Sequence, residues 1–122
     1  MTLLAEEKNP MKYMLLICVD PTEVIEPSPG GMQIEDWVDE MNSNGIRLDG
    51  ERLQAPSTAK TVRHRGGKII TTDGPFAETK EIMAGYDIIE AANLEQAIDV
   101  AAKHPMARAG LVEVRPFWVW AD

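Results

Sequence analysis

Cysteine is almost missing from this chain, because Cys18 is the only one among its 122 residues. A single cysteine cannot form a disulfide within the chain, so the fold is expected to be stabilised by packing alone. The composition fits a reducing compartment, and we expect a cytoplasmic location. Cys18 lies inside the apolar run 13–19. It is therefore interpreted as a small core residue rather than a nucleophile or a metal ligand.

Long apolar runs and clusters of basic residues are also missing. No stretch of the sequence approaches the roughly 18 to 20 apolar residues that cross a bilayer, so we expect no membrane span. The 12 lysines and arginines are scattered along a chain of net charge −8. Such a pattern cannot neutralise successive phosphates, so nucleic acid is not expected as a partner. Residues 1–10 hold only a short apolar stretch followed by acids, and we expect a loose leader before one domain at 11–122.

Motifs for metals and common cofactors are absent as well. The two histidines, His64 and His104, are far apart in the sequence and have no cysteine beside them, so they lack the spacing of a metal site. His64 adjoins a glycine turn and His104 ends a helix before Pro105, so both are interpreted as structural or solvated residues. Neither a nucleotide-binding glycine loop nor the serine-hydrolase motif G-x-S-x-G occurs. We expect no metal and no cofactor.

The chain does contain enough apolar material for one packed domain. Hydrophobic residues make up 44% of it and charged residues 26%, which is ordinary globular composition. Apolar patterning between turn signals predicts the strands. The expected strands cover residues 12–19, 46–53, 59–64, 68–72, 82–90 and 111–119.

Two amphipathic helices are predicted between these strands. The apolar stripe of the first comprises Ile34, Trp37, Val38 and Met41. The stripe of the second comprises Leu94, Ala97, Ile98 and Ala101. Asn44 followed by glycine is a natural end for the first helix. Asn93 and Gln96 are expected to cap the start of the second helix, which Pro105 ends.

A glycine turn at 65–67 joins two of the strands into a hairpin at 59–72. Without this hairpin the order is strand, helix, strand, strand, helix, strand. That order predicts an α+β, ferredoxin-like split βαβ fold with helices on one face of an antiparallel sheet. The first strand is apolar on both faces, and two helices can cover only one of them. A second copy of the sheet is the simplest cover for the other face, so we expect a homodimer.

Residues 71–81, Thr-Thr-Asp-Gly-Pro-Phe-Ala-Glu-Thr-Lys-Glu, resemble the hallmark segment of the DGPF group of the YCII-related proteins. Residues 11–17, 50–53 and 112–116 look like the first, second and last strands of that family, and the resemblance covers nearly all of 11–117. It implies the dimeric α+β barrel fold, with the hairpin as an insertion. The group is largely uncharacterised, and its members are often encoded near, or fused to, extracytoplasmic-function sigma factors.

Three features depart from the pattern of these relatives. Residues 84–87 read Ala-Gly-Tyr-Asp where relatives usually carry two glycines and two aromatics, so Asp87 brings an acid to a place where a ring is usual. We expect Tyr86 and Asp87 to contact the ligand of the site. Cys18 stands where relatives often have tyrosine. Some YCII relatives have a histidine and an aspartate proposed as a catalytic pair in the N-terminal half, but the first histidine here is His64, so that pair is not carried over.

Asp73 is the leading candidate for a functional carboxylate. In one reading it caps its own turn at Gly74, as aspartate commonly does. In the other reading it faces a partly enclosed cavity of the dimer, where burial suits it to general acid or base chemistry. Glu51 is the candidate second carboxylate, with a solvated residue at a strand edge as the alternative.

Arg63 and Arg115 are candidate ligand-binding residues, because a guanidinium binds a carboxylate or a phosphate with two hydrogen bonds. The alternative for Arg63 is an exposed residue of the hairpin. Glu78 and Lys80 follow the Asp-Gly-Pro-Phe segment, and we expect their loop either to surround the same pocket or to be simply solvated.

Two functions from different classes remain open. One is the binding or transformation of a small molecule at a polar site of the homodimer centred on Asp73, and the sequence leaves open whether such a site is an enzyme. The other is a non-catalytic accessory or regulatory module of an extracytoplasmic-function sigma-factor system, which rests on the resemblance alone. A buried Asp73 beside a cavity favours the first function, and an exposed Asp73 favours the second.

Overall fold

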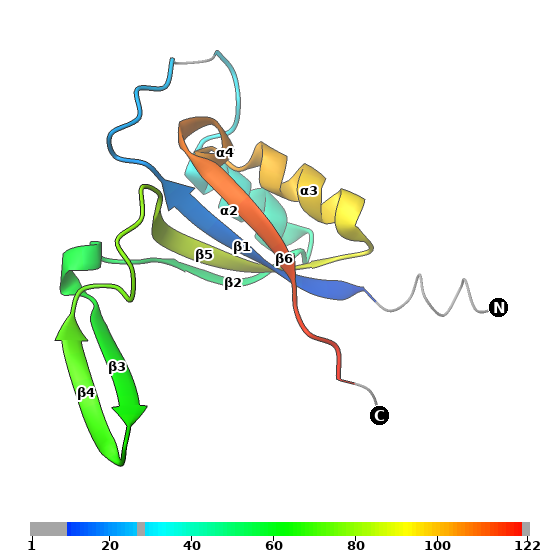
Figure 1. Cartoon of the computed structure of the whole chain (residues 1–122). Helices are drawn as coiled ribbons and strands as arrows, with labels where there is room; N and C mark the ends of the chain where they lie inside the picture. Colours follow the sequence, from blue (N-terminus) through cyan, green and yellow to red (C-terminus); the bar gives the residue numbers. More distant parts are fainter. Residues whose placement is uncertain (1–9, 27–28, 121–122) are drawn as a thin grey trace.

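A computed structural model describes residues 10–26 and 29–120 of the chain (Figure 1). In chain order the elements are β1 (Met11–Val19), α2 (Ile34–Ser43), β2 (Arg47–Arg52), a 3-10 turn (Pro56–Thr58), β3 (Lys60–Arg65), β4 (Lys68–Asp73), β5 (Ile82–Ala91), α3 (Leu94–Lys103), α4 (Met106–Ala109) and β6 (Leu111–Pro116). Residues 1–9 of the expected leader lie outside the described residues.

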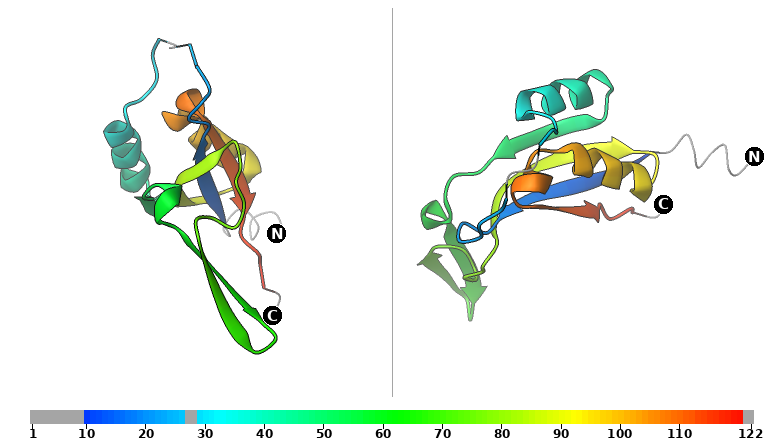
Figure 2. Two further views of the ribbon diagram at one scale, coloured as in Figure 1. Left: turned by 60° about the vertical axis from the view of Figure 1, so that its left-hand side comes forward. Right: turned by 90° about the horizontal axis from the view of Figure 1, so that it is seen from above.

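The main sheet is antiparallel and has the strand order β2-β5-β1-β6. Helices α2, α3 and α4 lie on one face of it (Figure 2). Apart from the β3–β4 hairpin, the chain runs β-α-β-β-α-β, which confirms the predicted α+β ferredoxin-like fold. None of the described helices is long and apolar enough to cross a membrane.

Strand β1 is apolar on both faces, but only one face is covered within the chain. Tyr13, Leu15 and Ile17 are buried beneath the helices. Leu16 and Cys18 point to the opposite face and are only half-buried, so the predicted core position of Cys18 is not beneath the helices. Burial raises the pKa of the Cys18 thiol, with a smaller contribution from nearby carboxylates, which disfavours the reactive thiolate.

Helix α2 is fixed to the rest of the core by Trp37. Its side chain is fully buried, and its indole Nε1–H donates a hydrogen bond to the carbonyl of Val100 on α3, with an N···O distance of 3.0 Å. The core position predicted for Trp37 is confirmed, as is the helix end at Asn44. Gly45 follows with a φ of 69°, in the left-handed region that favours glycine and lets the chain turn into β2.

Helix α3 begins as predicted but buries a different stripe. The Asn93 side chain accepts a hydrogen bond from the backbone N–H of Gln96, and the Gln96 side chain accepts one from the backbone N–H of Ala92. Both backbone N–H groups at the start of the helix therefore have a partner. Ala97 and Ala101 of the predicted stripe are buried. Val100 joins them, whereas Leu94 and Ile98 are about half exposed. The helix therefore approaches the sheet through its smaller residues.

Strands β3 and β4 form the predicted hairpin, which projects away from the main sheet (Figures 1 and 2). The last strand, by contrast, is shorter than predicted and ends at Pro116. Trp118 was expected on the apolar face of that strand but is 77% exposed. Helix α4, which follows Pro105, was not predicted.

Candidate functional site

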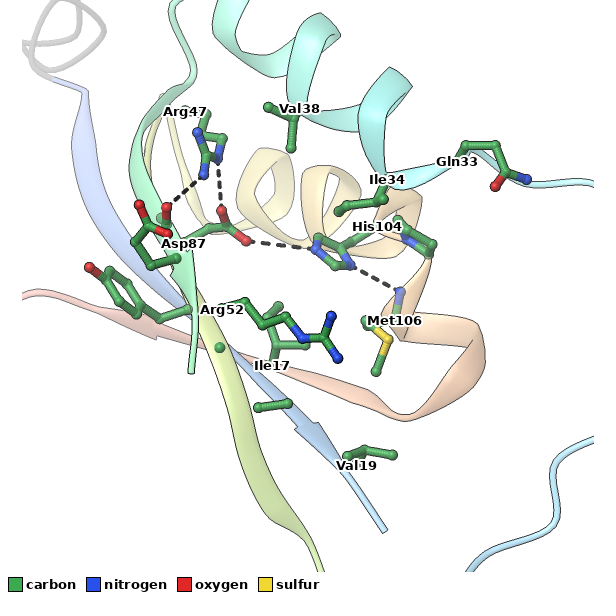
Figure 3. A pocket seen from close by; sticks show the side chains of 16 residues that line it. Ile17, Val19, Gln33, Ile34, Val38, Arg47, Arg52, Asp87, His104 and Met106 are labelled. Atoms are coloured by element: carbon green, nitrogen blue, oxygen red, sulfur yellow. Dashed lines mark hydrogen bonds and ion pairs between the residues drawn. The ribbon is translucent and has the colours of Figure 1, made fainter. Parts of the chain in front are cut away.

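A cavity of about 650 Å³ opens between α2 and the strands β2 and β5, beside the junction of α3 with α4 (Figure 3). Much of its wall is apolar. The apolar wall residues include Ile17, Val19, Ile34, Val38, Ala84 and Met106. Polar groups enter the wall from the strands and from the end of α3. They include Arg47, Arg52, Asp87 and His104. This mixture is typical of a site for a small organic molecule.

Asp87 is a buried carboxylate in this wall, with a side chain only 8% exposed. The residues two positions before and two positions after it on β5 are also buried. Because side chains alternate along a strand, Asp87 points with them toward the helices and away from the uncovered face. Its Oδ1 accepts a hydrogen bond from Nε of Arg47 at 2.8 Å. Its Oδ2 lies 3.7 Å from Nε2 of His104. Burial raises the pKa of Asp87, and the Arg47 guanidinium opposes this shift without cancelling it.

Arg47 is held in place by more than the carboxylate. Its Nη2 donates to the carbonyl of Gly50 at 3.0 Å, and its Nη1 lies 3.5 Å from Oδ1 of Asn42. The strand pairing shifts register between Arg47 and Asp49, so the arginine sits at an irregular point of β2. The guanidinium is therefore oriented by Gly50 and Asn42 as well as by Asp87.

Gly50 makes room for this ion pair. It is paired with Asp87 in the sheet register. A Cβ added at Gly50 would lie 2.1 Å from Oδ1 of Asp87 and 2.7 Å from Nη2 of Arg47. Glycine is required here by space, because any side chain would displace the carboxylate.

His104 completes the polar group at the end of α3. Its Nδ1 accepts the backbone N–H of Met106 at 3.0 Å, so in the neutral ring the proton is on Nε2, which faces Asp87. The ring meets Trp37 edge to face, with centroids 4.6 Å apart. Burial, reinforced by the nearby Arg47 cation, lowers the pKa of His104 to about 4. At neutral pH the imidazole beside Asp87 is thus uncharged.

Arg52 lies on the same face of β2 as Gly50, two residues further along. In Figure 3 its side chain reaches into the cavity toward Met106. Among the described residues it forms no hydrogen bond and no ion pair. It therefore presents an uncompensated positive charge to the cavity, unlike Arg47.

The sequence pattern of the YCII-related domain matches residues 11–121. The chain belongs to the YCII-related family. A 67-residue stretch, 53% of the chain, is 45% identical to an uncharacterised protein of Rhizobium meliloti (strain 1021). That stretch spans 54% of the length of the relative, so the chain covers about half of the protein it matches.

Three of the predicted site residues of this YCII-related protein belong to the cavity wall: Glu51, Tyr86 and Asp87. Glu51 and Tyr86 are paired in the register of β2 and β5. Because side chains alternate along a strand, both point to the face opposite Asp87. Only Asp87 joins the buried polar group.

Asp73 is exposed within the single chain, and the reading in which it faces a cavity of the dimer stays a prediction. Its side chain is 86% exposed, and its Oδ1 is paired with the ammonium of Lys60 across the hairpin. It does not belong to the cavity wall described above. The physical reason is that the hairpin projects from the body, so no described helix or strand of the chain covers it.

The remaining predicted residues of the YCII-related protein are not brought together by the fold. They are Arg63, Glu78, Lys80 and Arg115, and the cavity wall contains none of them. Lys80 lies 3.7 Å from Oδ2 of the buried Asp20. A hydrogen bond from the Thr22 hydroxyl is the main cause of a lowered pKa at Asp20. Arg115 pairs with Glu113 on the exposed part of β6.

Sequence reasoning missed Arg47 and Arg52 and interpreted His104 as a residue at a helix end. One signal was present: Asp87 stands in the apolar strand segment 86–89, and a buried acid requires a cationic or hydrogen-bonding partner. A search of the paired strand would then have reached Arg47. Within the described residues no group of three His, Cys, Asp or Glu side chains could hold a metal ion.

Proposed function

We propose that this YCII-related protein binds a small organic molecule in the cavity beneath α2 and exchanges a proton with it at Asp87. The observation that carries the proposal is the buried carboxylate of Asp87, which lines a cavity of about 650 Å³ between Arg47 and a neutral His104. The cavity is large enough for a molecule of one or two rings.

The polar group is better explained by function than by stability. Burying a charged pair costs desolvation energy that its attraction repays only partly, and apolar residues of similar size commonly stabilise a core as well or better. A buried acid in a cavity, with a pKa raised by burial, is a feature of functional sites. The Arg47 guanidinium opposes the raised pKa of Asp87 and holds its carboxyl group in one orientation.

The proton exchange follows from the two partners of Asp87. Oδ2 of Asp87 is the oxygen not bonded to Arg47, so it can accept a proton from an acidic C–H or O–H group of the ligand. The electron pair of the broken bond stays on the ligand. The Nε2–H of His104 is placed to donate a hydrogen bond to the same region.

A neutral probe tests occupancy of the cavity. Benzyl alcohol should shift the amide NMR signals of Gly50, Asp87 and Met106 in the wild type. Ile34→Trp should abolish these shifts, because Ile34 lines the cavity and a larger ring would fill it. Ile98→Trp is the matched control, since Ile98 is similarly exposed but lies outside the cavity wall. Shifts that persist in Ile34→Trp, or that never involve the cavity, would exclude the proposal.

The proposed working form remains the homodimer, joined through the uncovered face of the sheet. That face carries half-buried apolar side chains from β1 and β5, Leu16 and Ile88 among them. Glu51, Tyr86 and Arg115 lie on the same face by strand alternation, so a partner sheet would enclose them. Their expected role in ligand binding thus depends on the second copy.

A second candidate function is the accessory module of an extracytoplasmic-function sigma-factor system. The exposed Asp73 on a projecting hairpin favours a role at the surface for this motif. Sedimentation of the protein mixed with a purified sigma factor of this class tests it directly. If the two proteins sediment together and Asp73→Lys abolishes this, the accessory function is supported. If they sediment separately, that partner is excluded.

A further inference from the structure

The side chains that face the cavity carry an excess of positive charge. Arg47 is neutralised by the carboxylate of Asp87, 2.8 Å away. Glu51 points to the other face of the sheet, so it does not compensate the remaining arginine. Arg52 is left as the cation of the cavity wall without a partner among the described residues.

The local fold gives the Arg52 side chain its path into the cavity. Gly85 is its neighbour in the register of β2 and β5. A side chain at Gly85 would collide with the backbone, since an added Cβ would lie 2.9 Å from the carbonyl oxygen of Glu51. With no side chain opposite, Arg52 extends over the strand toward Met106 (Figure 3).

We propose that the ligand of this cavity is a small organic monocarboxylate whose carboxylate pairs with Arg52 and whose apolar part lies between Ile34, Val38 and the sheet. The inference rests on the proposed function and adds the chemical class of the ligand. A guanidinium matches the two oxygens of a carboxylate in one plane.

The rest of the wall argues for a monoanion with an apolar body. A phosphate ester carries more negative charge and more acceptor oxygens than one guanidinium can satisfy, and much of the cavity wall is apolar. Asp87 would also repel a dianion. A carboxylate held at Arg52 leaves the carbon skeleton to extend toward Asp87, where the proton exchange takes place.

Benzoate and benzamide, which have nearly the same shape and differ in charge, test this class of ligand at pH 7. Calorimetry and amide NMR shifts should show benzoate binding at least about tenfold more tightly than benzamide, equivalent to ~1.4 kcal/mol. Arg52→Gln should remove this preference, because it weakens benzoate binding far more than benzamide binding. Arg63→Gln is the control, because it removes the same charge from the hairpin, outside the cavity wall.

The possible results separate the two proposals. If benzamide shifts the cavity amides and benzoate binds no better, the carboxylate class is wrong while the cavity stands. The same conclusion follows if Arg52→Gln leaves the benzoate preference intact. If neither compound shifts the cavity amides, both this inference and the proposed function fail.

Discussion

At the scale of single residues, the candidate site depends on four residues brought together from three elements. Arg47 and Gly50 come from β2, Asp87 from β5, and His104 from the end of α3. The burial of the acid and the histidine moves both pKa values in the direction that favours the uncharged form. The consequences for stability have opposite signs for the two residues.

His104 should make the free energy of unfolding fall as the pH falls from about 6.5 to about 4. Its pKa is lowered in the folded state, so the unfolded chain binds more protons in that window and protonation favours unfolding. The full effect is on the order of 3 kcal/mol. Urea titrations across this range should show the advantage of wild type over His104→Gln shrinking as the solution is acidified. His64→Gln, a change at an exposed histidine of the hairpin, should retain the wild-type slope.

Asp87 acts in the other direction. Because its pKa is raised in the folded state, ionisation disfavours folding, and stability is lost as the pH rises through the interval between its unfolded and folded pKa values. Comparing His104→Gln with its Asp87→Asn double variant isolates this contribution. A stability difference between the two that stays constant with pH would show that Asp87 is not desolvated.

Gly50→Ala should destabilise the protein by about 2–4 kcal/mol, because the new methyl group displaces the carboxylate and breaks its bond to Arg47. In an Asp87→Ala background the same change should cost less than about 1 kcal/mol. Denaturant unfolding of the four proteins measures both values. Equal costs in the two backgrounds would mean that the carboxylate is not what Gly50 accommodates.

At the scale of elements, local sequence patterns predicted which helices and strands form better than they predicted where each element ends and which face it buries. Trp37 and the cap at Asn93 could be read from sequence because helix periodicity and capping depend on neighbouring residues. The stripe of α3 could not, since the choice of Val100 over Ile98 depends on how closely the helix approaches the sheet. The exposure of Trp118 likewise follows from where β6 stops at Pro116.

Trp37→Ala should cost about 3–5 kcal/mol in the free energy of unfolding, because it removes a fully buried indole and its bond to α3. It should also release the ring of His104, which packs against the indole. Trp118→Ala is the control and should change stability by less than about 0.5 kcal/mol. A loss below about 1 kcal/mol for Trp37→Ala would mean that α2 does not dock as described.

At the scale of the whole molecule, the sequence alone identified one residue of the buried polar group, and its partners became evident only from the fold. Asp87 was identified because it places an acid where relatives usually carry an aromatic ring. Its partners Arg47 and His104 are 40 and 17 positions away in the numbering of the chain, and only the strand pairing and the helix end bring them together. Asp73 drew attention through its motif, and the projection of the hairpin leaves it exposed.

The uncovered face of the sheet predicts a dimer at micromolar concentration in sedimentation experiments. Leu16→Glu should produce a folded monomer, because it introduces a charge in the centre of that face. Ile98→Glu places the same charge on the exposed side of α3 and should leave the dimer intact. A wild-type protein that sediments as a monomer and unfolds normally would show that the face needs no second copy.

The pKa of the Asp87 carboxyl, followed by carbon NMR with and without benzyl alcohol, tests the cavity as the functional site. Without the probe, the midpoint should lie above the ordinary aspartate value of 3.8, because the group is buried. With the probe it should rise further, because the alcohol displaces water from the cavity wall. An ordinary midpoint that the probe leaves unchanged would contradict the assignment of the site to Asp87.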